Sequence, residues 1–152
     1  MIKNFVYLFA LVAVIGCSND DDTNSEKDIE LLIGKWQITE KSVNGTKVIL
    51  SSCESLDTDE YLQDGNLIKL YSEPDQQSTS GCKQFEDNSG SWEKIKDSEY
   101  RVISDDGDIN EVRTIVFSME NNIHTASFSE TYQDSNGNYQ IENYIIKYTR
   151  VK

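Results

Sequence analysis

The stretch that decides the fold is Leu31-Leu32-Ile33-Gly34-Lys35-Trp36-Gln37-Ile38. Asp28 precedes it and is a residue type that caps helix N-termini, so the apolar run that follows is expected to form a short helical turn. Gly34 ends that turn, because glycine readily adopts the backbone conformation that terminates a helix. Trp36 and Ile38 then begin the period-two alternation of a strand.

The rest of the chain has a β pattern. Turn signals recur at Asn44-Gly45, Asp64-Gly65, Asp97-Ser98, Asp105-Asp106-Gly107, Asn121-Asn122 and Asn136-Gly137. Asn-Gly and Asp-Gly pairs tolerate the positive φ angles of tight hairpin turns. The segments between the turns, rich in Val, Ile, Thr, Tyr and Phe, predict strands at 35–43, 46–52, 57–63, 66–72, 90–96, 99–104, 110–118, 123–133 and 138–150. Pro74 lies in the longest predicted loop, 73–89.

These strands are expected to close into one barrel. No helical periodicity follows Ile33, so the chain lacks the crossover helices that parallel strands need. Closure removes the exposed sheet edges most completely, which favours an all-β, antiparallel up-and-down barrel of about eight strands; a sandwich is the alternative. A barrel of this size is either filled by side chains or holds one small ligand.

The order of landmarks resembles the lipocalin-like lipoprotein domains of Bacteroidetes, which are calycin-like barrels. The matching pieces are Leu32-Ile33-Gly34-Lys35-Trp36, Asn44-Gly45, Cys53, Tyr61-Leu62-Gln63-Asp64-Gly65, Cys82 and Gly90-Ser91-Trp92. The resemblance implies that Trp36 plugs one end of the barrel and that Gly34 lets the backbone pass close beneath it. It also implies that Arg150, on the last strand, covers Trp36; an exposed arginine near the C-terminus is the alternative. The family resemblance identifies no ligand.

The N-terminus has the layout of a bacterial lipoprotein signal. Residues 1–16 combine Lys3 with an apolar stretch from Phe5 to Ile15, which is short for a membrane span. Val14-Ile15-Gly16-Cys17 fits a lipobox, so Cys17 is expected to be lipidated and to become the new N-terminus. A buried N-terminal element is the alternative. Residues 17–28 are then an acidic tether, disordered by composition, and residues 29–152 form the barrel domain.

The charge restricts the partners. Without residues 1–16, the chain carries 13 basic and 27 acidic side chains, which argues against nucleic acid and against electrostatic docking on anionic lipid. Membrane attachment is therefore expected to come from acyl chains at Cys17. Ser18-Asn19-Asp20-Asp21-Asp22 resembles the signal that sends Bacteroidetes lipoproteins to the cell surface. We expect an outer-membrane location; whether the domain faces the periplasm or the cell exterior stays open.

The two remaining cysteines, Cys53 and Cys82, are expected to form a disulfide. They are an even pair in an exported protein, and the loop that they would close is worth roughly 3–4 kcal/mol on the chain-entropy model. Two thiol ligands of a metal are the alternative, but the chain has one histidine and no Cys-x-x-Cys motif.

Few residues favour catalysis, a metal or a cofactor. His124 is the only histidine, and its place in a predicted strand indicates a packed or surface residue rather than a general base. Asp106–Asn110 and Asp134–Asn138 each begin like a calcium loop. Neither continues with the required glycine and bidentate glutamate, so no metal and no cofactor is expected.

A non-catalytic binding module is therefore the leading hypothesis, for a small apolar or sugar-like ligand. The candidate ligand residues are Tyr61, Tyr71, Trp92, Tyr100, Phe117, Phe128, Tyr144 and Tyr148, and the alternative is that they are simply the core. Of these, Trp92 is expected near the open mouth. A second hypothesis is a filled barrel whose outer face or loop 73–89 docks another envelope protein. An empty lumen above roughly 300 Å³ would favour ligand binding.

Overall fold

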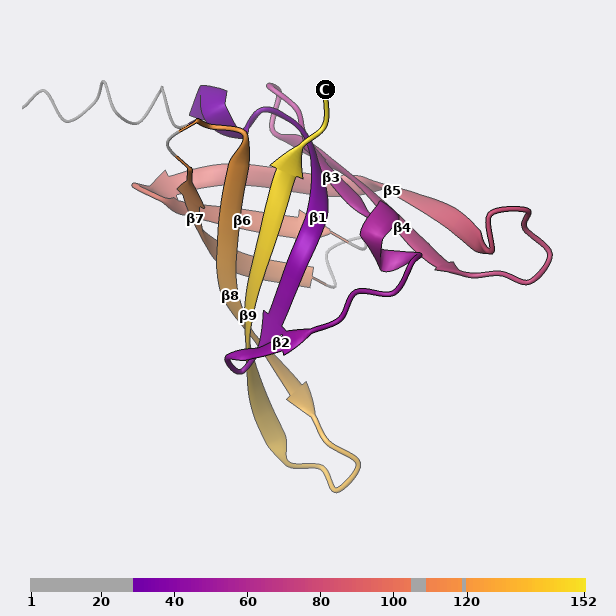
Figure 1. The fold of residues 1–152 in the computed structure, drawn as a ribbon. Helices are drawn as coiled ribbons and strands as arrows, with labels where there is room; N and C mark the ends of the chain where they lie inside the picture. Colours follow the sequence, from indigo (N-terminus) through magenta and orange to yellow (C-terminus); the bar gives the residue numbers. More distant parts are fainter. Residues whose placement is uncertain (1–28, 105–108, 119) are drawn as a thin grey trace, which may run out of the picture.

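The computed structural model describes residues 29–104, 109–118 and 120–152 of the chain. In this part, nine antiparallel strands form one sheet that curls into a barrel (Figure 1). The strands are β1 (Gly34–Val43), β2 (Thr46–Val48), β3 (Thr58–Tyr61), β4 (Asn66–Pro74), β5 (Cys82–Lys96), β6 (Glu99–Ser104), β7 (Ile109–Phe117), β8 (Ile123–Gln133) and β9 (Tyr139–Arg150). A helical turn at 29–32 enters β1, and a 3-10 turn, η1 (Glu54–Leu56), precedes β3.

The barrel closes between its first and last strands. Each of β3 to β8 pairs with the next strand along the chain, β1 pairs with β3, and β9 returns to pair with β1. In that closing pair Trp36 lies opposite Arg150 and Val43 opposite Tyr144. β2 is a short extra strand that pairs with the second half of β1. The predicted closed antiparallel barrel of about eight strands is therefore confirmed.

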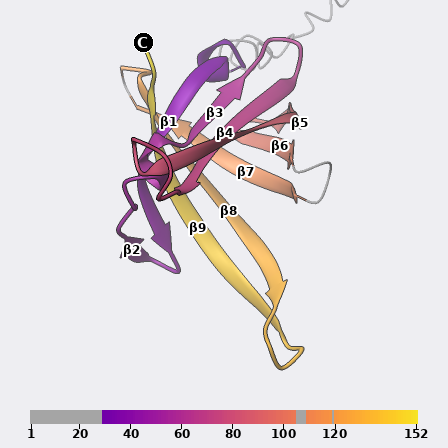
Figure 2. The same ribbon diagram turned by 90° about the vertical axis from the view of Figure 1, so that its right-hand side faces the viewer.

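The predicted loop 73–89 is wrong. β4 continues to Pro74 and β5 starts at Cys82, so only residues 75–81 turn the chain in a long hairpin. The polar segment from Lys83 to Ser89 gave no strand signal, because its outer part projects from the barrel and has no buried face to make it alternate. The predicted strand 46–52 is also shorter, ending at Val48. Both the β4–β5 and the β8–β9 hairpins extend beyond the barrel wall (Figures 1 and 2).

Cys53 and Cys82 are bonded to each other, which confirms the predicted disulfide, with their Cα atoms 5.6 Å apart. The bond joins the residue that precedes η1 to the first residue of β5. η1 and the segment after it are thereby held against the long hairpin. The alternative of two metal-binding thiols is excluded by this bond.

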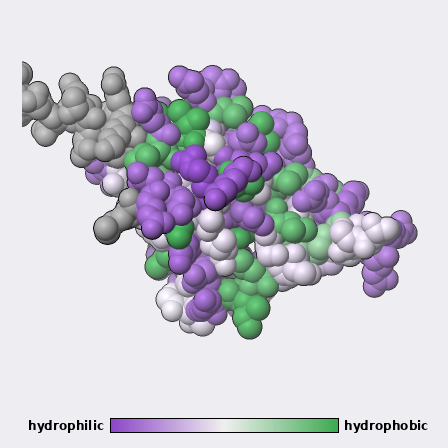
Figure 3. Space-filling view, turned by 45° about the horizontal axis from the view of Figure 1, so that its top comes forward, coloured by the Kyte–Doolittle hydropathy of each residue, from purple (hydrophilic) through white to green (hydrophobic). Residues whose placement is uncertain are grey.

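The core fills one end of the barrel. The largest fully buried side chains include Trp36, Tyr61, Tyr100, Leu32 and Leu67, which come from the helical turn and from four strands. Burial of each large apolar side chain contributes roughly 1.5–3 kcal/mol. On the face shown in Figure 3, hydrophilic residues surround smaller groups of hydrophobic ones.

Candidate functional site

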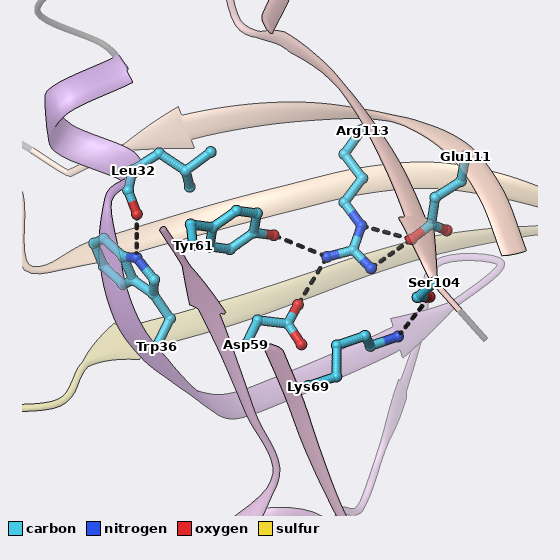
Figure 4. A network of polar contacts seen from close by, with 8 residues as sticks. All are labelled: Leu32, Trp36, Asp59, Tyr61, Lys69, Ser104, Glu111 and Arg113. Carbon is cyan, nitrogen blue, oxygen red and sulfur yellow. Dashed lines mark hydrogen bonds and ion pairs between the residues drawn. The ribbon is translucent and has the colours of Figure 1, made fainter. Parts of the chain in front are cut away.

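A buried arginine organises the interior of the barrel beyond the aromatic core (Figure 4). Arg113, on β7, is 3% exposed. Its Nη1 donates to Asp59 Oδ2 at 2.8 Å and to the Tyr61 hydroxyl at 3.0 Å, and its Nε donates to Glu111 Oε1 at 2.6 Å. Arg113 Nη2 also pairs with Glu111 Oε1. The guanidinium is therefore shared between two buried carboxylates on strands from different sides of the barrel.

The charges in this network set its protonation. Burial alone would raise the pKa of Asp59, but Arg113 and then Lys69 outweigh it, so the pKa lies below its ordinary value. Burial raises the pKa of the Tyr61 hydroxyl, which therefore stays protonated. A buried ion pair of this kind costs several kcal/mol when one partner is removed, because the other is left uncompensated. The barrel interior therefore has a fixed polar floor, which is formed by Asp59, Tyr61, Glu111 and Arg113.

Above this floor lies a cavity of about 430 Å³. Its walls come from η1 and from every barrel strand except β6. The described residues that line it include six carboxylates and three cations: Glu54, Asp57, Asp59, Asp87, Glu111 and Glu130 against Lys41, Lys69 and Arg113. The volume is in the range of small-molecule sites, and the lining is strongly charged for a space inside a barrel.

Two of the lining carboxylates have an oxygen without a hydrogen-bond partner in the part of the chain that the structure describes. These atoms are Glu111 Oε2 and Asp57 Oδ1, and both are buried. Burial raises the pKa of Asp57. A buried polar atom that makes no hydrogen bond costs roughly 1–3 kcal/mol, so these two oxygens lower the stability of this end of the barrel.

An aromatic pair forms one wall. The rings of Phe128 (β8) and Tyr144 (β9) stack with centroids 5.2 Å apart and planes 11° apart. Arg113 Cζ lies 5.2 Å from the Phe128 ring centroid, and Lys41 Nζ lies 5.6 Å from that of Tyr144. The Tyr144 hydroxyl donates to Glu142 Oε2 at 2.6 Å. The two rings therefore form a stack with a cation over each of them, beside the carboxylates.

The structure divides the eight predicted ligand residues into two groups. Tyr71, Phe128, Tyr144 and Tyr148 line the cavity. Tyr61, Trp92, Tyr100 and Phe117 do not; they pack in the core or against it, as the alternative reading expected. Trp92 in particular is not at an open mouth. Its Nε1 donates to Leu62 O at 3.0 Å, beside the turn that joins β3 to β4, and its ring packs edge-on against Tyr61.

The sequence interpretation missed the charged residues of the site. Glu111 and Arg113 have the same parity on β7 as the buried Ile115, and Asp59 has that of Tyr61 on β3. That shared parity was the available signal, since residues two apart on a strand face the same side of the sheet. Charged side chains are rarely buried, so parity alone does not single these residues out.

The opposite end of the barrel is closed by Trp36. Its Nε1 donates to Leu32 O at 2.7 Å, and Arg150 Cζ lies 4.1 Å from the ring centroid (Figure 4 shows the first contact). Arg150 also donates to the carbonyl oxygens of Leu31 and Ile33, at the C-terminal end of the helical turn. Gly34 has φ +126°, and a Cβ there would lie 2.7 Å from Arg150 Nη1. The three residues named for closure therefore meet at this end.

No protein-family model matches this chain, and no curated protein matches it.

Among the residues that the structure describes, no helix is long and apolar enough to cross a membrane. The same residues contain no group of three or more His, Cys, Asp or Glu side chains placed to hold a metal ion. Cys17, the signal and tether segments, and residues 106–108 of the first calcium-like loop lie outside the described residues. In the second such loop, Asp134 accepts hydrogen bonds from the backbone of Asn136 and Asn138, as in a hairpin turn.

Proposed function

We propose that this protein is a lipid-anchored, non-catalytic binding protein of the cell envelope, and that its barrel holds a small polar, sugar-like ligand. The observation that carries the proposal is the charged cavity of about 430 Å³ beside a stacked aromatic pair. Hydroxyl groups donate hydrogen bonds to carboxylates and accept them from lysine and arginine, and the aromatic rings add apolar contacts.

Of the two ligand types expected from the sequence, the polar one has the better support. An apolar ligand would displace water from the charged side chains that line the cavity without replacing its hydrogen bonds, which is unfavourable. An anionic lipid would meet an excess of carboxylates. A polyhydroxyl ligand avoids both penalties.

Native mass spectrometry of the protein purified from its own membrane tests this function. We expect a co-purified small molecule that is lost in Tyr144→Ala, which removes half of the aromatic wall. Tyr139→Ala is the matched control, because Tyr139 is on the same strand but is 76% exposed and does not line the cavity. A protein that carries no small molecule, or a Tyr144→Ala variant that keeps it fully, would count against the proposal.

The anchoring part of the proposal rests on the lipobox and on the resemblance to lipocalin-like lipoproteins. We expect Cys17→Ala to prevent lipidation, leaving an uncleaved or soluble species in place of an outer-membrane protein. Fractionation with labelled palmitate measures this directly; labelled Cys17→Ala in the membrane fraction would refute it.

Replacing Asp20, Asp21 and Asp22 with Ala tests whether the domain faces the cell exterior. Protection from protease added to whole cells would assign the surface signal to them.

A second candidate function is docking to another envelope protein. It is supported by the projecting β8–β9 hairpin, where Tyr139 and Ile141 share one face and are 76% and 64% exposed. A docking protein does not need a cavity, so this function leaves the charged lumen unexplained. The Tyr139→Ala control separates the two functions, since it alters only the hairpin.

A further inference from the structure

One edge of the projecting β8–β9 hairpin has no partner strand among the described residues. β9 pairs with β8 all the way from Ile123 to Gln133, but β7 pairs with β8 only as far as Ser127. Beyond that residue the hairpin leaves the barrel (Figures 1 and 2). The residues from Ser129 to Gln133 are all exposed. The side of this segment that faces away from β9, which we call the β8 edge, is therefore open to solvent.

The hydrogen-bonding groups of the β8 edge belong to Ser129, Thr131 and Gln133. Successive residues of a strand point their N–H and C=O groups to opposite edges. On the β7 side, Ser118 N donates to Ile123 O at 2.8 Å, so the odd-numbered residues of β8 point away from β9. The β8–β9 register runs without a shift, so this parity holds to the end of the strand.

The β8 edge lacks the features that usually protect a free edge. Proteins prevent pairing with other chains by short edge strands, lysine, proline or bulges. Such features are present elsewhere in this sheet: β2 is 3 residues long and contains Lys47, and β4 ends in Glu73 and Pro74. The segment 128–133 has neither lysine nor proline, and its one charge is Glu130. The β8 edge is therefore competent to pair with another strand.

The opposite edge of the hairpin, on β9, is shorter. Asn44 N donates to Asn143 O at 2.8 Å, and Asn143 N donates to Asn44 Oδ1 at 3.0 Å. These bonds occupy the part of the β9 edge nearest the barrel. A two-stranded hairpin is marginally stable in water, and a third strand adds stability. The β8 edge is the longer place for that strand.

We propose that the β8 edge pairs with the β8 edge of a second copy of this chain, antiparallel about a two-fold axis at Thr131. In this register Thr131 pairs with Thr131 of the second copy and Ser129 pairs with Gln133 of the second copy, so each outward-pointing residue has a partner. Glu130 lies opposite Tyr132 of the second copy. The inference goes beyond the proposed ligand function and does not depend on it.

A second copy fits because the β8 edge is complementary to itself in this one register. An axis at Glu130 or at Tyr132 would place Glu130 opposite Glu130 or Asp134 of the second copy, and like charges there are destabilising. An axis at Ser129 would need a residue that already pairs with β7. The axis at Thr131 gives a favourable Thr–Thr pair at the centre, with no two carboxylates opposite each other.

Sedimentation equilibrium of the full-length chain in density-matched detergent tests the pairing. We expect a monomer–dimer equilibrium. Thr131→Pro should raise the dimer dissociation constant about ten-fold or more, because each copy loses the N–H at the centre of the pairing. That N–H points away from β9, so the hairpin itself loses no hydrogen bond, and an edge strand tolerates such a proline.

Ile141→Pro is the matched control. Ile141 lies directly opposite Thr131 on β9. Asn143 O accepts from Asn44 on the far side of β9, so the N–H of Ile141, which has the same parity, also points away from β8. The control therefore places a proline at the same level of the hairpin without touching the β8 edge. It should leave the dimer dissociation constant unchanged.

Oxidative cross-linking in the native membrane tests the register without a proline. The Cα atoms of Thr131 in the two copies should be about 5.5 Å apart, which is within disulfide range. Thr131→Cys should therefore form a disulfide-linked dimer. Ile141→Cys, at a position that is 64% exposed, should not.

Each outcome decides for or against the β8 edge. A wild-type protein that is monomeric at its highest soluble concentration overturns the proposal, as does a Thr131→Pro variant that dimerises as tightly as the wild type. Loss of the dimer in Ile141→Pro, with cross-linking through Ile141→Cys, would assign the contact to β9 and overturn it too. The proposed ligand function stands in every case, since neither Thr131 nor Ile141 lines the cavity.

Discussion

His124 lies among four aromatic rings at the centre of the core. Its ring centroid is 4.4 Å from that of Trp36, 4.8 Å from that of Tyr148, 5.8 Å from that of Phe117 and 6.4 Å from that of Tyr61. Neither imidazole nitrogen has a hydrogen-bond partner among the described residues. Burial lowers the pKa of His124 from 6.5 to about 3, although Asp59 opposes the shift. The imidazole is therefore neutral in the folded protein, and it is packed, as expected from its strand.

This burial couples the stability of the barrel to pH. The unfolded chain binds a proton at His124 below pH 6.5, whereas the folded chain does so only near pH 3. The contribution to stability is therefore complete above pH 6.5 and is lost as the pH falls toward about 3. When the pH falls from about 7.5 to about 4.5, the protonation of His124 in the unfolded chain lowers the free energy of unfolding by about 2–3 kcal/mol. Arg113 and Arg150 also face the ring and resist its protonation.

His124→Phe should remove this pH dependence. The variant loses no hydrogen bond and keeps a ring among rings, so we expect it to be at least as stable as the wild type at about pH 7.5. It should lose about 2–3 kcal/mol less than the wild type on going to about pH 4.5. Urea unfolding of both proteins at the two pH values measures the difference, and carboxylates that titrate in both cancel from it. Parallel loss of stability in the two proteins would contradict the prediction.

At the scale of elements, turn residues and alternation made most of the barrel predictable. Asn44, Gly45, Gly65, Ser98, Asn121 and Gly137 all have positive φ at hairpin turns, as their types indicated. The strand signal failed where a strand leaves the barrel, as in residues 83–89, because a strand without a buried face need not alternate. It also failed to mark β2 as short.

The candidate site was less predictable than the fold. The aromatic candidates rest on residue type alone, and half of them do not line the cavity. The burial of Arg113 and Glu111 could not be predicted from residue type, because an isolated charge is almost never buried. What buries them is a partner, Asp59, that is far away in the sequence and adjacent only after the barrel closes. Alternation can indicate the face of a strand, but it cannot identify a partner across the lumen.

The disulfide is expected to support the cavity as well as the fold. It holds the segment from Glu54 to Asp57, whose two acids line the cavity, against β5. Replacing Cys53 and Cys82 together with Ser should cost roughly 3–4 kcal/mol, because the unfolded chain regains the freedom of the closed loop. The same variant should bind ligand more weakly at a temperature where it is still folded. Urea unfolding with and without reductant measures the first effect; an unchanged midpoint in the double variant would argue against it.

In the molecule as a whole, one end of the barrel interior stabilises the fold and the other end is the candidate binding site. The Trp36 end is buried and aromatic, and its contacts are made within the chain. The other end is a charged cavity with unpartnered acceptors, an arrangement that lowers stability and that binding sites commonly retain. Stability and binding should therefore respond to substitutions in different places.

The two tryptophans test this division. Trp36 is fully buried, and Trp92 packs against Tyr61 and Tyr100 close to the same end, so both tryptophans belong to the core. Trp36→Ala and Trp92→Ala should each cost roughly 3–5 kcal/mol, the range for removing a large buried aromatic side chain. Tyr139→Ala, on the exposed hairpin, should change the free energy of unfolding by no more than about 0.5 kcal/mol.

Urea unfolding of the three variants decides the matter, because a core residue shifts the midpoint and a surface residue does not. Domains of this size have roughly 5–15 kcal/mol of stability, so both tryptophan variants should remain measurable at low temperature. Under those conditions each should still bind the ligand, since neither tryptophan lines the cavity. A Trp92→Ala variant as stable as the wild type but defective in binding would return Trp92 to the mouth of the barrel. It would also remove the separation between a structural end and a binding end.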